Sequence, residues 1–504
     1  MKWTNTVIKM ASTWNIKRVR QYTDSPLLTQ QQVFDYLIDA AKSTQFGKEH
    51  HFVSIRNYAD FQRQIPIRTY EQMQPYIASM MQGKKDVLWR GQIKWFARSS
   101  GTTAAKSKYI PVSIENLKQC HLQGGHDMMA NWYQSYPNTT MFSTDSKAIL
   151  MGGEINTFDA QVPTYVGDVS AIMIQQMPIY AKYFLTPDVA TSLLPDWEIK
   201  LERIAQTALH QNITNISGVP TWTLLLFRRI LELSGKDNLS EVYPNFELYS
   251  HGGVSFEPYR SQFQALFPAG NVQYRNAYNA SEGFFAGQMQ PDAQGMQLML
   301  GNGVFFEFVP LDNLLDENPT AYTLADVQLD TQYALVISTN AGLWRYLIGD
   351  TVRFTSLFPH HIEITGRTAQ AINVFGEEVM VWNTDQALSK TCQLLDAKIA
   401  DYTVAPIFME QGKGGHEWAV EFEQRPKDLA QFAQVLDESL QAINSDYAAK
   451  RYKNMALQSL VLQAVPSGTF GRWLKGKGKF GGQHKVPRLS TTRTIIEELL
   501  LQEV

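Results

Sequence analysis

Short apolar segments alternate with helical segments between about residues 95 and 350, and this alternation constrains the fold more than any other feature. The segment KAILMGG (147–153) has the pattern of a buried strand. TWTLLLFRRILELSG (221–235) has that of a helix, with Thr221 as a candidate cap and Gly235 as its stop. Two further strands, FELYSHGG and VQYRNAY, lie on either side of the helical segment EPYRSQFQALF. This order predicts an α/β architecture with a largely parallel sheet.

Outside this region the order of the elements changes. Residues 1–90 predict mostly helices. From residue 303, closely spaced strands with few helices between them indicate a small antiparallel sheet or barrel. After Gly366, a helix, two strands, a long helix and another strand indicate a compact α+β unit. We therefore predict two domains, 1–366 and 367–504.

The composition excludes several classes of protein. The chain has 504 residues, 44% of them hydrophobic, and a formal net charge of −3, whereas nucleic-acid binding would need a strong basic excess. Cys120 and Cys392 lie far apart and form no metal or redox spacing. No apolar run approaches the roughly 18 residues of a membrane span, and the N-terminus lacks a signal-peptide pattern. We expect a cytoplasmic globular protein without nucleic-acid or membrane partners, of unknown oligomeric state.

The strongest chemical motif is RSSGTTAAKSKYIPVS (98–113), which follows the apolar strand Ile93–Ala97. Small hydroxyl residues flank a glycine, and backbone N–H groups in such a turn can point at phosphate oxygens, with Lys106 and Lys108 adding charge. The motif is not a Walker loop, because Lys106 stands where that loop needs glycine. A solvated loop rich in serine and threonine is the alternative interpretation.

Three further segments carry candidate ligand-binding residues. NAYNASEGFFAG (276–287) ends an apolar strand near Glu282, and a carboxylate at such a strand end can hold Mg²⁺ that bridges phosphates. WRYLIGDTVRF (344–354) places Asp350 after a glycine, where it can accept hydrogen bonds from ribose hydroxyls. Paired glycines in SHGGVSFEP (250–258) let the backbone approach a flat ligand. Read alone, the segment with Glu282 favours an ordinary surface carboxylate, and the segment with Asp350 favours an ordinary hairpin turn. The paired glycines can instead simply close a turn.

Taken together, these segments occur in the order used by the adenylate-forming superfamily. Within it, the chain most resembles the auxin-responsive acyl acid amido synthetases, as a bacterial-type member. The position of Lys108 and the phrases AGLWRYLIGD and GGQHKVPR favour that subgroup, and the resemblance runs from about residue 50 to 490. Two departures stand out. Ala104 and Ala105 replace the usual glycines and narrow the conformations of the first loop, and Ala369 stands where many superfamily members keep Asp.

The resemblance implies the adenylate-forming fold, in which a large N-terminal α/β domain with parallel sheets and a small antiparallel barrel precedes a smaller, mobile C-terminal α+β domain. It implies ATP and Mg²⁺, a carboxylic acid activated as acyl-adenylate, and an amine, usually from an amino acid, that displaces AMP. The implied phosphate-binding residues are Ser99, Ser100, Gly101, Thr102, Thr103 and Lys108. The implied adenine slot is formed by Asn276, Tyr278 and the backbone of Gly252 and Gly253. Ser281 is a further implied nucleotide-binding residue, Glu282 holds Mg²⁺, Asp350 takes the ribose, and Arg367 lies close to Asp350 at the hinge.

The stretch GRWLKGKGKFGGQHK (471–485) matches two nucleotide-loop patterns at once. No strand-to-glycine junction precedes Gly476, and Pro487 interrupts the stretch, so we interpret both matches as coincidental hits in a loop. Seven Lys or Arg residues and no Asp or Glu lie between Pro466 and Thr494. The resemblance places the late catalytic lysine of the superfamily at Lys485. It implies that the loop acts as a mobile lid that contacts the phosphates of the nucleotide. A solvated basic surface loop is the alternative.

The leading hypothesis is an ATP-dependent acyl acid–amino acid ligase. An acyl-CoA ligase, which shares the first half-reaction, and a nucleotide-binding protein without turnover are the alternatives. The helix 221–235 and the strands near 147–175 would wall an apolar pocket, which favours a hydrophobic or aromatic acid. We exclude metal sites at the residues His50, His51, His121, His126, His360 and His361, which lack a carboxylate at convincing spacing. Ser217 and Ser255 lack a nucleophile elbow.

Overall fold

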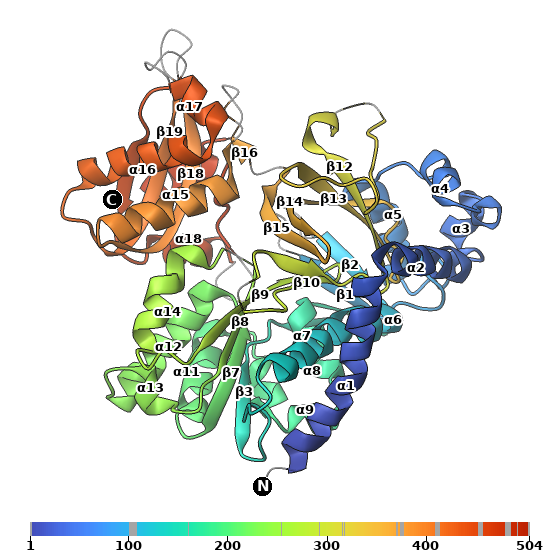
Figure 1. Cartoon of the computed structure of the whole chain (residues 1–504), viewed down its shortest axis with the longest axis horizontal. Helices are drawn as coiled ribbons and strands as arrows, with labels where there is room; N and C mark the ends of the chain where they lie inside the picture. The colour runs from blue at the N-terminus through green and yellow to red at the C-terminus, as the bar shows by residue number, and fades with distance from the viewer. Residues whose placement is uncertain are drawn as a thin grey trace. The chain divides into compact units, whose positions relative to one another are not determined.

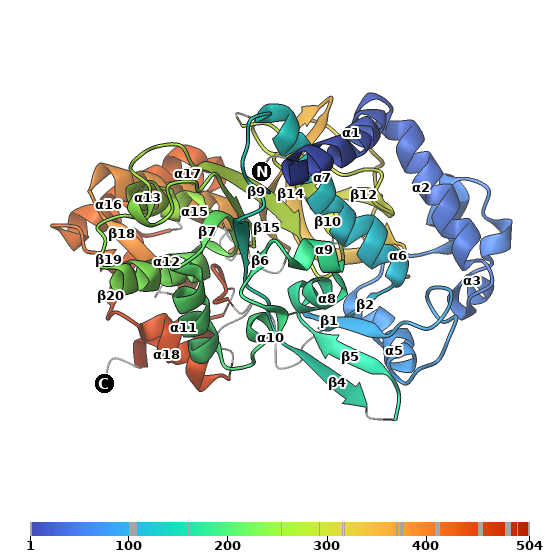
Figure 2. The same ribbon diagram turned by 90° about the horizontal axis from the view of Figure 1, so that it is seen from below.

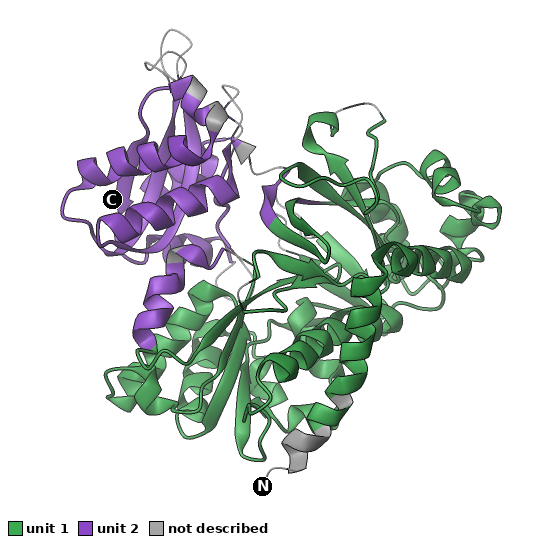
Figure 3. Ribbon diagram, viewed as in Figure 1, with its two compact units in different colours: residues 1–253, 267–348, 352–363 green, residues 254–266, 349–351, 364–504 purple. Residues whose placement is uncertain are grey.

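The chain forms two compact units (Figure 3). The computed structural model describes residues 3–99, 108–159, 161–253, 255–291, 293–314, 316, 318–368, 371–372, 377, 379–408, 414–451, 457–478, 485–490 and 492–501. Unit 1 comprises Met1–Gly253, Phe267–Ile348 and Val352–Glu363, and unit 2 comprises Val254–Leu266, Gly349–Thr351 and Ile364–Val504. Unit 2 thus adds two short segments to the C-terminal part of the chain. The domain boundary at residue 366 stays a prediction.

Helices dominate the first part of unit 1, as the sequence predicts. They are α1 (Trp3–Asp24), α2 (Pro26–Ala41), α3 (Gln45–Glu49), η1 (Phe52–Ser54), α4 (Tyr58–Gln64) and α5 (Tyr70–Met81). Pro26 suits the first position of α2, where its missing N–H costs no hydrogen bond. On α5 the residues Met73, Ile77 and Met80 recur three and four apart and are buried. The long helix α1 runs beside α7 (Leu122–Ser135), as Figures 1 and 2 show.

The largest sheet of the described residues has eleven strands in the order β12-β13-β14-β15-β11-β10-β9-β8-β7-β3-β6. Its strands are β3 (Ser146–Leu150), β6 (Leu185–Thr186), β7 (Asn212–Gly218), β8 (Leu248–His251), β9 (Gln273–Asn279), β10 (Phe284–Gly287), β11 (Met296–Leu298), β12 (Val304–Pro310), β13 (Gln332–Thr339), β14 (Tyr346–Leu357) and β15 (His360–Arg367). Neighbours from β6 to β9 pair in parallel. β9 then pairs antiparallel with β10. The antiparallel strands that we expected to form a smaller sheet or barrel therefore belong to the same hydrogen-bonded sheet as the parallel ones.

A second, four-stranded sheet has the order β2-β1-β5-β4 (Figure 2). Its strands are β1 (Trp95–Ser99), β2 (Lys108–Val112), β4 (Ile155–Asp159) and β5 (Thr164–Gly167). β1 pairs antiparallel with β2 and parallel with β5. The segment that links β1 to β2 is the predicted phosphate loop.

Helices between the strands of unit 1 follow from local sequence signals. They are α6 (Ile114–Asn116), the π-helix η2 (Leu117–His121), α7, α8 (Val169–Gln176), α9 (Ile179–Lys182), α10 (Val189–Ser192), α11 (Trp197–Ala208), α12 (Pro220–Ser234), α13 (Leu239–Val242) and η4 (Leu311–Asn313). Gly235 ends α12 in the left-handed conformation, with φ +62°, which confirms it as the stop. Thr221 as its cap was wrong, because Val219 holds that position and Pro220 begins the helix. Among the described helices, none is long and apolar enough to cross a membrane.

Unit 2 contains a three-stranded sheet in the order β18-β19-β20 with helices around it (Figure 1). Its elements are η3 (Glu257–Tyr259), α14 (Arg260–Leu266), β16 (Ala371–Ile372), β17 (Val379–Met380), α15 (Val381–Leu394), β18 (Lys398–Phe408), β19 (Gly414–Gln424), α16 (Leu429–Ile443), α17 (Ser445–Arg451), β20 (Val461–Val465), α18 (Thr469–Gly476) and α19 (Thr494–Leu500). The predicted long helix at 427–451 is divided at Asn444, whose side chain accepts a hydrogen bond from the backbone N–H of Tyr447.

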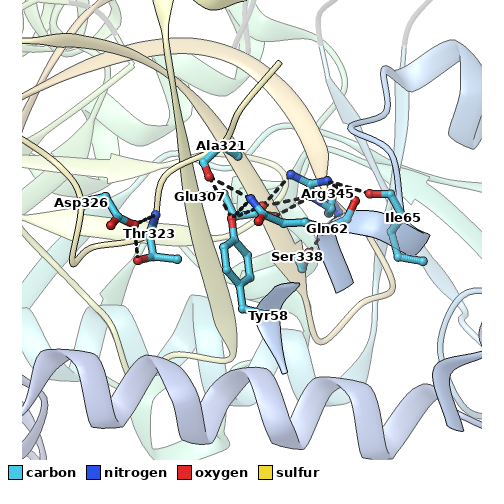
Figure 4. A network of polar contacts seen from close by, with 9 residues as sticks. All are labelled: Tyr58, Gln62, Ile65, Glu307, Ala321, Thr323, Asp326, Ser338 and Arg345. Atoms are coloured by element: carbon cyan, nitrogen blue, oxygen red, sulfur yellow. Dashed lines mark hydrogen bonds and ion pairs between the residues drawn. The ribbon is translucent and has the colours of Figure 1, made fainter. Parts of the chain in front are cut away.

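A buried ion pair joins the helical start of unit 1 to its antiparallel strands (Figure 4). The Arg345 guanidinium donates to both carboxylate oxygens of Glu307, at 3.0 and 3.1 Å from Nε, and to the carbonyl oxygen of Ile65 at 2.7 Å. The Tyr58 hydroxyl donates to the same carboxylate at 2.8 Å, and burial raises the pKa of Tyr58. Arg345 has φ +43°, and its backbone N–H donates to Ser338. This network fixes the chain where it enters β14.

Arg345→Met should therefore destabilise the protein strongly, because it leaves the fully buried Glu307 carboxylate without its cation. Breaking one partner of a buried pair costs about 3–5 kcal/mol. Urea unfolding of the variant measures this change. Arg353→Met is the matched control, since the pair of Arg353 with Glu363 is partly exposed and such pairs contribute about 0–1 kcal/mol. Equal losses for the two variants would contradict the assignment.

Candidate functional site

The loop between β1 and β2 begins and ends at paired residues. Ser99 ends β1 and Lys108 begins β2, and the two face each other in the antiparallel pair. The predicted phosphate-binding residues Ser100, Gly101, Thr102 and Thr103 lie outside the described residues. The Lys108 ammonium lies 5.6 Å from the centre of the Tyr70 ring. The two ends of the hairpin thus fix where the loop leaves the sheet and where it returns.

A partly buried cluster of charges lies at the base of this loop. Arg98 on β1 forms an ion pair with Glu154. Lys200 on α11 is buried and donates to the carbonyl oxygen of Gly152 at 2.7 Å. The pKa of Lys200 is lowered to about 8 by burial, against the opposing effect of the Asp168 carboxylate. The cluster carries two positive and two negative side chains, so its charges offset one another.

Sequence reasoning missed Lys200, although a signal was present. Lys200 follows Trp197 by three residues and precedes Ile204 by four, so it falls on the apolar stripe of an amphipathic helix. A lysine on such a stripe is buried and must find hydrogen-bond acceptors.

The first of the paired glycines, Gly252, lies beside β9 without room for a side chain. Gly252 follows β8, and a Cβ atom on it would lie 2.4 Å from the carbonyl oxygen of Ala277. Gly253 has φ +83°, a conformation that favours glycine. Asn276 and Tyr278 flank Ala277 in β9, and Tyr278 is buried. The structure therefore brings the four predicted adenine-side residues to one stretch of the sheet.

Glu282 lies in the tight turn between β9 and β10. The turn is closed by the backbone N–H of Ala280, which donates to the carbonyl oxygen of Gly283 at 2.9 Å, and Ser281 belongs to the same turn. Glu282 is buried, with 6% exposure, and its carbonyl oxygen accepts a hydrogen bond from Asn116 at 3.5 Å. A buried carboxylate at the end of a parallel strand is placed where ligands bind in α/β sheets.

In unit 2, Asp350 and Arg367 form an ion pair, with 3.0 Å between Arg367 Nε and Asp350 Oδ1. Asp350 is buried with 5% exposure, whereas the Arg367 side chain is 41% exposed. Gly349 has φ +92°, and its carbonyl oxygen accepts from the backbone N–H of Thr368 at 2.8 Å. The carboxylate is thus held at the start of the hinge segment.

Lys485 belongs to the same unit and is electrostatically coupled to this pair. The pKa of Lys485 is lowered to about 8, first by burial and then by the Arg367 guanidinium, while the Asp350 carboxylate acts in the opposite direction. An anion bound nearby would therefore favour the charged ammonium.

The stretch with two nucleotide-loop patterns is partly helical. Gly471 to Gly476 lie in α18, where Phe470, Trp473 and Leu474 are buried. At the start of α18 the N–H groups of Gly468 and Phe470 donate to the Glu421 carboxylate, and from Arg472 onward the helix binds its own N–H groups, so these groups are not available to a phosphate. The helix agrees with our interpretation that the first nucleotide-loop pattern, at Gly471 to Lys477, is coincidental. Our expectation that residue 471 begins a loop was wrong. Residues 479–484, which include the second half of the second pattern, lie outside the described residues.

The predicted walls of the acid pocket lie together in unit 1. A Cβ atom on Gly218, at the end of β7, would lie 2.9 Å from Thr223 Oγ1 on α12 and 3.1 Å from Met151 Cε. A Cβ atom on Gly152 would lie 2.6 Å from Ile174 on α8. Glycines allow α8, α12 and the end of β3 to approach closely here.

Two of the histidines that we excluded as metal ligands, His50 and His121, have other partners. The His50 ring stacks on Phe46 at 4.0 Å between centroids. His121 Nδ1 lies 3.2 Å from Asn279 Oδ1, and burial lowers the pKa of His121 to about 4. The described part of the chain holds no group of three or more His, Cys, Asp or Glu residues that could bind a metal ion.

Three family models match consecutive parts of the chain. They are described as the N-terminal domain of the GH3 family at residues 15–272, its central domain at 297–367 and its C-terminal domain at 383–494. Similar curated proteins include the indole-3-acetic acid-amido synthetase GH3.3 of Arabidopsis thaliana, 21% identical over 97% of this chain and 94% of the relative. The jasmonoyl–L-amino acid synthetase JAR4 of Nicotiana attenuata is 22% identical over 91% of this chain and 90% of its own.

Solved structures with the same fold include two kinds of ligase. The acyl acid amido synthetase GH3.15 in complex with 2,4-DB has a TM-score of 0.79, with 16% identity, over 98% of this chain and 96% of that chain. The 2-hydroxyisobutyryl-CoA ligase in the postadenylation state has a TM-score of 0.62, with 11% identity, over 96% and 92%. The fold is therefore that of adenylate-forming ligases, as the sequence predicted.

Gly252→Ala should weaken ATP binding, because the added methyl group must displace the backbone of Ala277 beside the predicted adenine slot. We expect the dissociation constant to rise about tenfold, or ~1.4 kcal/mol. Calorimetric titration with ATP measures it. Gly125→Ala is the control, because Gly125 lies in α7 with open space around it. ATP binding by the Gly252 variant at the level of the control would contradict the assignment.

Proposed function

The chain belongs to the GH3 family, and from this membership we propose that it activates a carboxylic acid with ATP and joins the acyl group to an amine. The observation that carries the proposal is the position of Gly252, which has no side chain and packs beside β9. The same strand, β9, leads to the buried Glu282. Relatives that match almost the whole chain are named as amido synthetases of indole-3-acetic acid and of jasmonate with amino acids. An amino acid is therefore the proposed acceptor.

The residues present suit ATP and Mg²⁺. Gly252 has no side chain to keep a flat base away from the backbone beside β9, and Asp350 can accept hydrogen bonds from the ribose. Glu282 offers a buried carboxylate, and Mg²⁺ in nucleotide sites is held by one or two carboxylates together with phosphate oxygens. Bound there, Mg²⁺ would neutralise phosphate charge.

The reaction needs no covalent bond to the protein. A carboxylate oxygen attacks the α-phosphorus, the bond to the bridging oxygen breaks, and pyrophosphate leaves. The amine then attacks the acyl carbon, AMP leaves, and the amine proton passes to solvent. Lys108 and Lys485 would stabilise the negative charge that gathers around the α-phosphate, which is the main contribution that positioned cations make.

The structure also bears on the acid. The segments expected to wall its pocket meet around Gly152 and Gly218, where the neighbouring side chains Met151, Ile174 and Leu193 are apolar. A hydrophobic or aromatic acid is the proposed substrate class. We also propose a cytoplasmic location, because Cys120 and Cys392 are both buried and free, as is usual in a reducing compartment.

A panel of acids and amines tests the function directly. We expect acid-dependent exchange of pyrophosphate into ATP that requires Mg²⁺, followed by AMP release and an amide of matching mass when an amino acid is added. A thioester formed only with coenzyme A would instead support the acyl-CoA ligase. ATP binding without exchange for any acid would support a binding protein without turnover.

Lys485→Ala should separate the two half-reactions. Loss of a cation at the α-phosphate should lower pyrophosphate exchange about 10²-fold or more, whereas amide formation from a supplied acyl-adenylate should change by less than about threefold. Lys477→Ala is the control, because Lys477 lies in the same basic stretch and pairs with Glu498 on the surface. Equal loss in both half-reactions would refute the role given to Lys485.

A further inference from the structure

We propose that Arg488 is a positioning residue for Lys485, holding the segment 485–490 (the lysine segment) so that the ammonium is presented for adenylation. This inference rests on the proposed role of Lys485. Arg488 follows Lys485 by three residues and is buried, with 9% exposure. A buried arginine so close to a reactive lysine either stabilises the fold alone or also positions that lysine for the reaction.

The Arg488 guanidinium binds three partners within unit 2. Nη1 forms an ion pair with Asp401 and donates to the carbonyl oxygen of Tyr402 at 2.9 Å. Nη2 donates to the Tyr259 hydroxyl at 3.0 Å. The guanidinium also lies 4.6 Å from the centre of the Tyr402 ring. These contacts fix the orientation of the Arg488 guanidinium and its position next to β18.

The backbone on both sides of Arg488 is attached to the same strand. The carbonyl oxygen of Arg488 accepts from the N–H of Val404 at 2.9 Å, and the N–H of Ser490 donates to the carbonyl oxygen of Val404 at 3.0 Å. The Thr403 hydroxyl donates to the carbonyl oxygen of Pro487 at 2.6 Å. The lysine segment is thus attached to β18 at Pro487, Arg488 and Ser490, on the C-terminal side of Lys485.

The contact with Tyr259 distinguishes Arg488 from an ordinary core arginine. Tyr259 ends η3, six residues beyond Gly253 in the chain, and its hydroxyl also donates to the carbonyl oxygen of Ala400 at 3.4 Å. Arg488 therefore ties the lysine segment to the segment that follows the predicted adenine slot. A rigid attachment at both points reduces the conformational freedom of Lys485 before ATP arrives, which is the advantage of preorganised charge.

Arg451 offers a matched comparison in the same unit. It is buried with 8% exposure and donates to both carboxylate oxygens of Asp437, from Nε at 2.9 Å and from Nη2 at 2.7 Å. Its Nη1 donates to the carbonyl oxygen of Leu457 at 3.0 Å, so these contacts join α16 and α17 to the chain that leads to β20. Substitution of either arginine breaks a buried ion pair, but Arg488 is itself part of the lysine segment.

The test compares Arg488→Met, Arg488→Lys and Arg451→Met in both half-reactions, with the acid that gives the fastest exchange. We expect Arg488→Met to lower pyrophosphate exchange about 30-fold while amide formation from the supplied acyl-adenylate changes by less than about threefold. Arg488→Lys should restore part of the exchange. Arg451→Met should lower the melting temperature without separating the half-reactions. Equal loss in both half-reactions for Arg488→Met would overturn the inference.

A double variant decides whether Arg488 acts through Lys485. If it does, Arg488→Met should have almost no further effect on exchange in the Lys485→Ala background, because coupled residues are not additive. Full additivity would overturn the inference. If Lys485→Ala leaves adenylation intact, the role of Lys485 fails by itself and the positioning role falls with it.

A measurement without turnover completes the test. Hydrogen exchange of the peptide covering residues 485–490 should accelerate at least about tenfold in Arg488→Lys and Tyr259→Phe, and not in Arg451→Met. These milder variants also answer the question if Arg488→Met does not fold. Unchanged exchange in this peptide for both would refute the proposed anchoring.

Discussion

The fold depends on a charge pair that is removed from water. Glu307 has no exposure, and its carboxylate is satisfied only because Arg345 and Tyr58 approach it from two other parts of the chain. Without these partners the buried carboxylate would be prohibitively costly. The pair therefore requires that the first helices, β12 and the entry to β14 meet in one arrangement (Figure 4). Asp350 lies further along the same strand, so the network also sets the start of a strand that carries a proposed nucleotide residue.

Unit 2 contains two further buried ion pairs, and we assign them different roles. Arg451 and Asp437 lie among α16 and α17 and hold helices together. Arg488, three residues from Lys485, pairs with Asp401 of β18. The two pairs are chemically alike. Only their surroundings distinguish the structural role of Arg451 from the proposed positioning role of Arg488. Buried ion pairs fix geometry more dependably than they add stability, which suits a segment that must present one lysine.

The candidate site could be read from the sequence where its residues are neighbours in the chain. The pair Gly252–Gly253 and the turn with Glu282 carry local patterns that the structure brings to one stretch of the sheet. Lys200 and Arg488 show the opposite case. Their acceptors are 48 and 87 residues away in the chain, at Gly152 and Asp401, so no local pattern names them. A charged residue on an apolar stripe indicates burial but not the identity of its partner.

The sequence by itself determined most of the order of helices and strands, because this order depends on hydrophobic periodicity. It also determined the stop of α12 at Gly235, through the φ preference of glycine, and the chemical type of the proposed nucleotide residues, through short motifs. Tertiary structure decided that the antiparallel strands continue the parallel sheet, and that residues 471–476 form a helix over an apolar core. It also decided which arginine anchors Lys485. Strand neighbours and buried charge partners depend on packing between segments that are distant in the chain. The free energy of that packing cannot be inferred from any single stretch of the sequence.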